Sequence, residues 1–522
     1  MYRLFRRLLT HFARPRNRHC VQTQAAWLPA FFGGVLAASC TDSGHVVATG
    51  SGPEASTPPD GSSDLDAGDS SSEAQTCPTL TGGPPGIAPL PSAAEVVYQR
   101  RELLGFAHLG LETFDGTEHG GSADSPSLFN PTSLDASQWV TAFKNAGVRQ
   151  VTLVAKHETG FCLWPSAFTD YSVKSSPWKG GQGDVVREFT DAMHAAGMAV
   201  GFALSPLDNH YPSSSSTYET YYRNLLTELL TNYGPVAELF LAGFEAPTSL
   251  NWSGIAALAH QLQPSVVIMM GPEIAATGAD IRYIGNQTGQ GNRSLSSVGA
   301  IPDGGPPSAW YPAEAPVSDR YPEWFWHPVD SGNSVASLTS LQTMYFNTVG
   351  MNSTLSVNIP PATTGQLDTP DLTLLGQFGT WYSSLLRTDL LRGQPVAADS
   401  SWQNPGFDPS KAVDDDVCTY WAAASGTTSA RLEVTPNAST TFTVISIREP
   451  IELGERSTAY HIEIRRNGSW NTSPTDTSGA MIAGTVIGER QLWQVNSTTA
   501  DAIALVIDSA KNVPAIAEFS VY

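Results

Sequence analysis

Hydrophobic and polar positions follow two periods between residues 88 and 393, which indicates strands alternating with helices. Apolar runs of strand length occur at 104–110, 151–155, 199–205, 237–241 and 266–270. Apolar positions spaced as on one helix face occur at 134–146, 184–197, 218–231, 253–262 and 374–386. Such alternation predicts βα units, and about 300 residues of them favour a (β/α)8-type barrel, an α/β fold, over a doubly wound sheet. No GxGxxG or Walker loop supports a nucleotide-binding sheet.

The helical period ends near Arg392, and short strands follow. Runs with strand character occur at 441–448, 459–464 and 502–507, with turn residues between them. We therefore predict a barrel domain over 88–393 and an all-β sandwich over 394–522.

The amino-terminal residues have the pattern of a secretory signal. Residues 1–41 hold six Arg and no acid, and an apolar run over 25–39 precedes Cys40. That run is too short for an ordinary membrane-spanning helix. The end of the run, Ala37-Ala38-Ser39-Cys40, resembles a bacterial lipobox, in which the cysteine becomes lipidated. This predicts a secreted or cell-surface protein, namely a bacterial lipoprotein that contacts the membrane only through its lipid. The alternative is plain secretion.

Residues 41–87 are predicted to be a disordered linker. They are rich in Ser, Gly, Pro and acids, and such a segment buries too little apolar area to offset the entropy of ordering. Cys77, Cys162 and Cys418 are widely spaced and form neither a disulfide framework nor a CxxC metal motif, so a pairing of Cys77 stays open.

Charge excludes one class of partner. The chain has 28 Lys and Arg against 49 Asp and Glu, a net charge of −21. Nucleic acid binds basic surfaces, so we expect no nucleic-acid partner.

Several long runs carry a resemblance to a known family. They include AKHETGFCLWPSAFTDYSVKSSPWKGGQGDVV from Ala155, DIRYIGNQTG from Asp280 and VGMNSTLSVNIPP from Val349. In this order they resemble the α-L-fucosidase family of retaining glycoside hydrolases, and the segment at Glu118 resembles its α-1,3/4-fucosidase branch. AVDDDVCTYWA from Ala412 resembles a discoidin-like (F5/8 type C) carbohydrate-binding domain. The resemblance implies fucosylated oligosaccharides or glycoconjugates as partners.

A retaining glycosidase needs two carboxyl groups about 5 to 5.5 Å apart, one as nucleophile and one as acid/base. The resemblance places the nucleophile at Ala242 and the acid/base at Gln287. A methyl group cannot attack, and an amide cannot deliver a proton. Glu245 and Glu158 are candidate displaced carboxylates, because each follows a predicted strand of the barrel.

The resemblance also implies a sugar pocket of imidazole, aromatic and charged side chains, which suits a hydroxyl-rich ligand with one apolar face. The implied substrate-binding residues are His108, Glu118, His119, His157, Tyr171, Arg282 and Trp326.

No cofactor is expected, and no HExxH or comparable spacing indicates a catalytic metal. Asp414, Asp415 and Asp416 are candidate ligands of a structural Ca²⁺ in the sandwich, although an exposed turn is the favoured explanation of these residues. Three functions remain open: an α-L-fucosidase acting on terminal α-L-fucose at the cell surface, a fucosyl-glycan-binding protein without hydrolysis, and an adhesin that binds through the sandwich.

Overall fold

The structure, a computed structural model, describes residues 77–522 except 79, 122, 213, 242–246, 248, 272–277, 300–308 and 328–334. The predicted signal with Cys40, residues 41–76, Ala242 and Glu245 lie outside the described residues. Among the helices that are described, none has the length and apolar character needed to cross a membrane.

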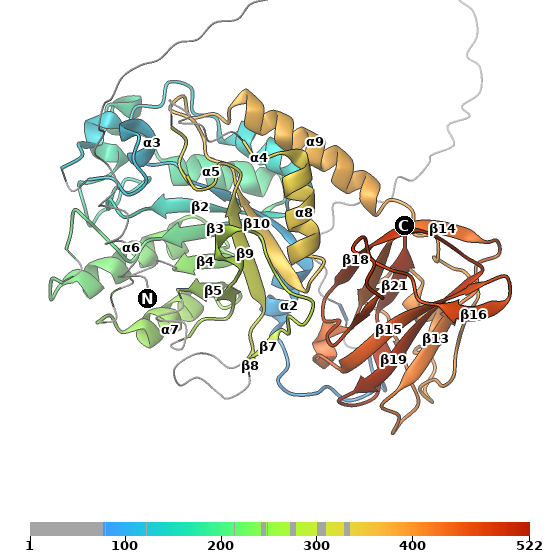
Figure 1. Ribbon diagram of the computed structural model, residues 1–522. Coiled ribbons are helices and arrows are strands. Elements are labelled where there is room, and N and C mark those ends of the chain that lie inside the picture. The colour runs from blue at the N-terminus through green and yellow to red at the C-terminus, as the bar shows by residue number, and fades with distance from the viewer. Residues whose placement is uncertain are drawn as a thin grey trace, which may run out of the picture. The chain divides into compact units, whose positions relative to one another are not determined.

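Eight parallel strands form a nearly closed barrel (Figure 1). The order around it is β5-β4-β3-β2-β1-β10-β9-β6, and a bridge between Met269 and Ile281 brings the two ends together. The strands are β1 (Leu103–Ala107), β2 (Gln150–Lys156), β3 (Ala199–Leu204), β4 (Glu238–Leu241), β5 (Val267–Met270), β6 (Arg282–Tyr283), β9 (Ala313–Ser318) and β10 (Ser353–Asn358). The predicted barrel is confirmed.

The barrel helices begin where the sequence supplies capping groups. Asp135 accepts hydrogen bonds from the first-turn N–H groups of Ser137 and Gln138, and Asp184 accepts one from Arg187, as N-cap residues do. The helices are α2 (Ala93–Arg101), α3 (Glu112–Asp115), α4 (Ala136–Asn145), α5 (Val185–Ala195), α6 (Tyr218–Asn232), α7 (Trp252–Leu262), α8 (Leu338–Thr348) and α9 (Thr369–Leu385). A short hairpin of β7 (Val298–Gly299) and β8 (Ala309–Trp310) lies between β6 and β9.

Two buried carboxyl groups face each other inside the barrel. Glu238 of β4 accepts hydrogen bonds from the Gln150 amide and, at 2.8 Å, from the Thr152 hydroxyl. Glu314 of β9 accepts one from the Tyr98 hydroxyl. Burial, and then the charge of Glu238, raises the pKa of Glu314 well above its ordinary value. Burial raises the pKa of Glu238 as well, but the hydrogen bonds that it accepts oppose this shift, so Glu238 is the more acidic member of the pair and Glu314 keeps its proton.

The carboxy-terminal domain is an antiparallel sandwich, as predicted. One sheet has the order β11-β13-β19-β15-β16 with β17 on β15, and another has β18-β14-β21. Buried side chains such as Trp421, Ile445 and Leu505 form its core. The strands are β11 (Val396–Ala398), β12 (Trp421–Ala422), β13 (Ala430–Val434), β14 (Thr440–Arg448), β15 (Ser457–Arg466), β16 (Ser469–Thr472), β17 (Ala483–Gly484), β18 (Gln491–Ala500), β19 (Ala502–Ala510), β20 (Ala515–Ile516) and β21 (Glu518–Val521).

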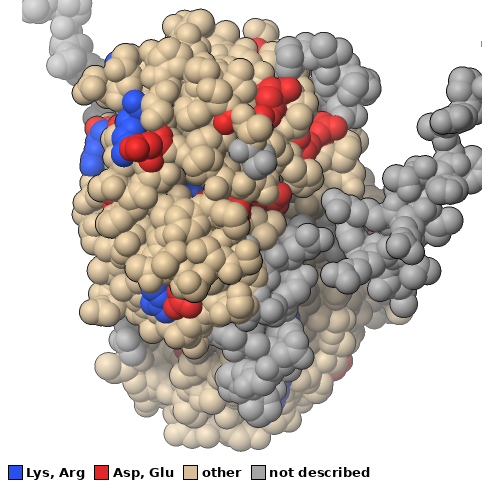
Figure 2. Space-filling view, turned by 90° about the vertical axis from the view of Figure 1, so that its left-hand side faces the viewer, with Lys and Arg blue, Asp and Glu red and all other residues tan. Residues whose placement is uncertain are grey.

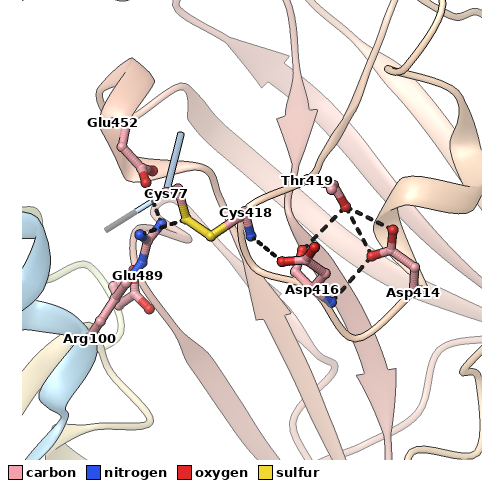
Figure 3. Close-up of a disulfide and its surroundings, with 8 residues drawn as sticks. All are labelled: Cys77, Arg100, Asp414, Asp416, Cys418, Thr419, Glu452 and Glu489. Atoms are coloured by element: carbon pink, nitrogen blue, oxygen red, sulfur yellow. Dashed lines mark hydrogen bonds and ion pairs between the residues drawn. A yellow bond between two sulfur atoms is a disulfide. The ribbon is translucent and has the colours of Figure 1, made fainter. Parts of the chain in front are cut away.

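A disulfide joins Cys77 to Cys418 of the sandwich (Figure 3). Residues after Cys77 continue along the same domain: the Trp402 indole donates to the Gly82 carbonyl at 2.7 Å, and the Ile87 N–H donates to the Leu453 carbonyl at 2.9 Å. We expected residues 77–87 to belong to the linker. The structure instead places the described part of this segment on the sandwich, where the disulfide and these bonds hold it.

Alternating charges connect the barrel to the sandwich. Arg100, at the end of α2, donates to Glu452 at 2.5 Å and points toward Cys77 (Figure 3). Glu102, immediately before β1, accepts from Arg448 at 2.5 Å and from Arg490 at 3.0 Å. Three of these side chains (Arg100, Glu102 and Arg448) are less than a tenth exposed, so loss of one partner would leave a buried charge only partly compensated.

Candidate functional site

The predicted site residues that follow β1 and β2 lie at the same end of the barrel. His108 follows the last residue of β1, and His157 and Glu158 follow the last residue of β2. The two strands are parallel neighbours, so their carboxyl ends meet there. In Figure 1, β2 points to the left-hand side, and Figure 2 shows that face, where one group of Asp and Glu lies away from Lys and Arg and others lie beside them. We call this end the mouth.

His108 is a neutral imidazole that presents a lone pair. Its Nδ1 lies 2.7 Å from Oδ1 of Asn358, whose amide nitrogen donates to Ser318 Oγ and to the Trp324 carbonyl. The Asn358 oxygen can only accept, so Nδ1 carries the proton. Burial, and then the positive charge of His157, lowers the pKa of His108 to about 3. Nε2 is therefore an acceptor.

His157 has the opposite character. Its Nδ1 donates to Glu112 Oε1 at 3.0 Å, and the Glu112 carboxylate is fully buried. Burial would lower the pKa of His157, but the hydrogen bond and charge of Glu112, with the charges of Glu158 and Glu118, raise it. The ring centroids of His157 and His108 are 5.9 Å apart. The mouth thus combines one imidazole that accepts with another that donates.

Aromatic rings lie beside these imidazoles. The Trp324 ring is 5.1 Å from His108, and the Phe325 ring is 4.9 Å from His157. Trp326, the residue implied by the resemblance, instead donates its indole N–H to Asp368 at 2.6 Å. Trp324 and Phe325 therefore contact the two histidines, and Phe106 stacks on His108 at 4.9 Å.

Glu118 holds the loop that carries those rings. Its carboxylate accepts the backbone N–H groups of Trp324, at 2.8 Å, and of Phe325, at 3.2 Å, and it lies 2.7 Å from His327 Nε2. Glu118, Glu323 and His327 also form a group, found among the described residues, whose ligand atoms are close enough to hold a metal ion. With Glu118 already engaged by three donors, the arrangement is explained by loop anchoring.

His119 and Glu158 interact with each other at the rim. His119 Nδ1 lies 3.1 Å from Glu158 Oε2, and the His119 side chain is 71% exposed. Asn209 donates its amide N–H to the His119 carbonyl at 3.3 Å. Oε2 of Glu158 is thus engaged by His119. Its second carboxylate oxygen, Oε1, has no hydrogen-bond partner among the described residues and can accept from a ligand.

Two further predicted pocket residues are used elsewhere. The Tyr171 hydroxyl donates to the Asp124 carbonyl at 2.8 Å, and its ring stacks on His210 at 4.0 Å. Arg282 donates to the Ser296 carbonyl, and a Cβ on Gly299 of β7 would lie 2.9 Å from its Nη1. Among the described residues, Arg282 thus contacts β7 and the segment that leads into it.

Gln287 is the last residue of the short 3₁₀ turn η5 (Gly285–Gln287), which follows β6. The backbone φ of Gln287 is 65°. Positive φ is uncommon for a residue with a side chain, so the turn is locally strained. Gln287 therefore follows the carboxyl end of a barrel strand, where a catalytic group is expected. Ala242 and Glu245 lie outside the described residues, so their predicted roles stay predictions.

Sequence reasoning missed Glu112 and Asn358, the partners that set the two imidazoles in opposite states. Glu112 is five residues beyond β1, in the four-residue helix α3. The sequence did contain one signal for Glu112. This residue follows a barrel strand, as His108 and His157 do, and active-site residues of such barrels follow strand ends.

Two family models match the chain. The one described as Alpha-L-fucosidase matches residues 111–384, and the one described as F5/8 type C domain matches residues 395–519. The chain is 35% identical over 461 residues to Alpha-L-fucosidase 1 of Arabidopsis thaliana, across 84% of this chain and 88% of that protein.

Solved structures have a similar fold. A Ruminococcus gnavus glycoside hydrolase 29 fucosidase in complex with fucose matches with a TM-score of 0.75 and 26% identity, over 86% of this chain and 97% of that one. A glycoside hydrolase 29 family member from an unknown rumen bacterium matches with a TM-score of 0.71 and 29% identity, over 84% and 78% of the two chains.

Proposed function

Because this chain belongs to the α-L-fucosidase family of glycoside hydrolases, we propose that it takes the terminal α-L-fucose of glycans as its ligand at the mouth of the barrel. The observation that carries the proposal is the pair of imidazoles. His108 offers an acceptor and His157 a donor to sugar hydroxyl groups, and Trp324 and Phe325 lie beside them for the apolar face of the ring.

Binding without rapid turnover is the form of this function that the substituted positions favour. The nucleophile position is Ala242 and the acid/base position is Gln287, and neither side chain can perform its step. Loss of either carboxyl group alone normally costs several orders of magnitude in rate, and the two losses need not add.

Hydrolysis is the second candidate, and Glu158 is the observation that favours it. This carboxylate follows β2 directly beside His157, where active sites of such barrels are built. Glu245, outside the described residues, is the other displaced candidate.

We further propose a secreted or cell-surface location, with Cys40 as the lipid anchor of a bacterial lipoprotein. The Cys77–Cys418 disulfide supports an extracytoplasmic location, because disulfides persist in oxidising compartments. The sandwich would add a glycan-binding surface to the barrel.

A structural Ca²⁺ in the sandwich is part of the proposal. Asp414 accepts from the Thr419 hydroxyl at 2.8 Å, and the Asp415 N–H donates to Glu518 at 3.0 Å. Burial, and then the charge of Asp389, raises the pKa of Glu518 to about 8. Asp389 Oδ2 is buried with no hydrogen-bond partner among the described residues. A hard cation would satisfy these oxygens.

The test measures binding and turnover on one sample of the full chain. L-fucose binding by calorimetry is combined with hydrolysis of an aryl α-L-fucoside at high protein concentration. We expect binding, its loss in His108→Ala, and turnover near background. Turnover that Glu158→Ala or Glu245→Ala removes would establish the hydrolytic form instead. The absence of both signals would refute the fucose assignment.

A further inference from the structure

Glu112 is a buried carboxylate whose partner, His157, belongs to the proposed sugar site. It is fully buried, and one of its oxygens, Oε1, accepts from His157. The other oxygen, Oε2, makes no hydrogen bond among the described residues. An ionised carboxylate costs free energy to bury unless a positive partner compensates it, and the His157 imidazole is the group in place to do so.

The local backbone makes room for this carboxylate. A Cβ added to Gly110 would lie 2.4 Å from Glu112 Oε2, closer than real Cβ atoms approach an oxygen. Any larger residue at 110 would push the carboxylate away from His157. The short helix α3 begins at Glu112, directly after the strand end that carries His108.

The ring of His157 is thereby oriented as well as charged. With Nδ1 committed to Glu112, the remaining nitrogen, Nε2, has no hydrogen-bond partner among the described residues, and the side chain is 20% exposed. The titratable groups that face His157 are Glu112, Glu158, Glu118 and His108. Three of the four are carboxylates, and His108 is neutral, so the surroundings favour the imidazolium form.

We infer that Glu112 is a positioning residue that holds His157 as an imidazolium with its Nε2–H directed to a hydroxyl or ring oxygen of the bound sugar. This inference rests on the proposed fucose site. It predicts that the site takes a neutral sugar through a charged donor. Affinity is then present while His157 is protonated and is lost as pH rises through the pKa of His157, because that pKa is raised above its ordinary value.

Two measurements on the full chain separate this inference from the proposed function. Histidine-selective NMR follows the titration of each imidazole between about pH 5 and pH 9 without any ligand. Calorimetry follows L-fucose affinity over the same range. The variants are Glu112→Gln, Glu112→Asp as the conservative rescue, and Asp115→Asn, which removes one carboxylate from the same helix without contact to a histidine.

We expect the pKa of His157 to lie above the ordinary value of an imidazole, because its Nδ1 donates to the buried Glu112 carboxylate. In Glu112→Gln the His157 titration should move to lower pH, and fucose affinity near pH 6 should fall about tenfold, the factor expected when a charge-assisted hydrogen bond becomes neutral. Glu112→Asp should recover part of both effects, and Asp115→Asn neither.

Three results would overturn the inference. The first is a neutral His157 at pH 6 in the unchanged protein. This measurement does not depend on the folding of any variant. The second is an unchanged His157 titration in a folded Glu112→Gln. The third is fucose affinity that does not vary with pH although His157 titrates. The proposed function fails separately if no fucose binding occurs at any pH, in which case the NMR titration alone confirms or refutes the control of His157 by Glu112.

Discussion

Replacing Glu314 by Gln tests whether the interior of the barrel holds a proton that the unfolded chain would release. Glu314 and Glu238 are both buried, and the donors Gln150 and Thr152 serve Glu238. Glu314 therefore stays protonated, because burial and the charge of Glu238 raise its pKa well above the ordinary value of 4.5. A Gln side chain has the same shape and can donate its amide N–H to Glu238 at every pH.

The size of the effect follows from proton linkage. Above the unfolded pKa and below the folded one, the native state binds one proton more than the unfolded state. The free energy of unfolding then falls by about 1.4 kcal/mol for each pH unit. The unchanged protein should therefore lose stability with rising pH relative to Glu314→Gln, which has no proton to hold, throughout the window between the unfolded and the folded pKa of Glu314.

Urea unfolding of the full chain at several pH values in this window, followed by intrinsic fluorescence, measures the difference. Asp191→Asn is the matched control, because its side chain is 65% exposed on α5 and its pH curve should parallel that of the unchanged protein. Parallel curves for Glu314→Gln and the unchanged protein would refute a buried shared proton.

Two further predictions concern the sandwich. The double change Cys77→Ser and Cys418→Ser should lower the midpoint of thermal unfolding. By the chain-entropy relation, a disulfide that closes a loop of 341 residues adds at most about 6 kcal/mol to the free energy of unfolding. We expect a loss of about 2–4 kcal/mol. An unchanged midpoint in the double variant, or under a reductant, would contradict this. Calcium should raise the midpoint of thermal unfolding and a chelator should lower it, and Glu518→Gln should abolish both responses. A calcium response that survives in Glu518→Gln would place the ion elsewhere.

The first half of the barrel could be predicted because local signals agree with the tertiary structure. Every residue of β2 is buried, and four of its five central residues, Val151–Ala155, are apolar. Asp135 begins helix α4 as expected. The strands β6 and β9 gave no such signal. β6 has two residues, and β9 reads AEAPVS, with a Pro and an inward-facing Glu in a central strand. Those residues form strands because the neighbouring strand β10 pairs with β9 throughout its length.

The site was predictable only in part. Histidines after strand ends indicated His108 and His157, but their partners Asn358 and Glu112 are 250 and 45 residues away from them in the sequence. The position of Glu112 just after β1 was the one local signal, and nothing local distinguishes Asn358 from other polar residues. The same holds for Cys77 and Cys418, whose spacing allows a bond but does not require it, since only the fold brings them together.

The disulfide also determines how the folded chain responds to mechanical load. Tension applied through the residues that precede Cys77 reaches the sandwich across one covalent bond, at Cys418. Helix α2 and strand β1, which come next along the chain, lie outside that load path. A pull from the amino-terminal side would therefore be resisted by the sandwich sheets, and the mouth of the barrel would keep its geometry under stress.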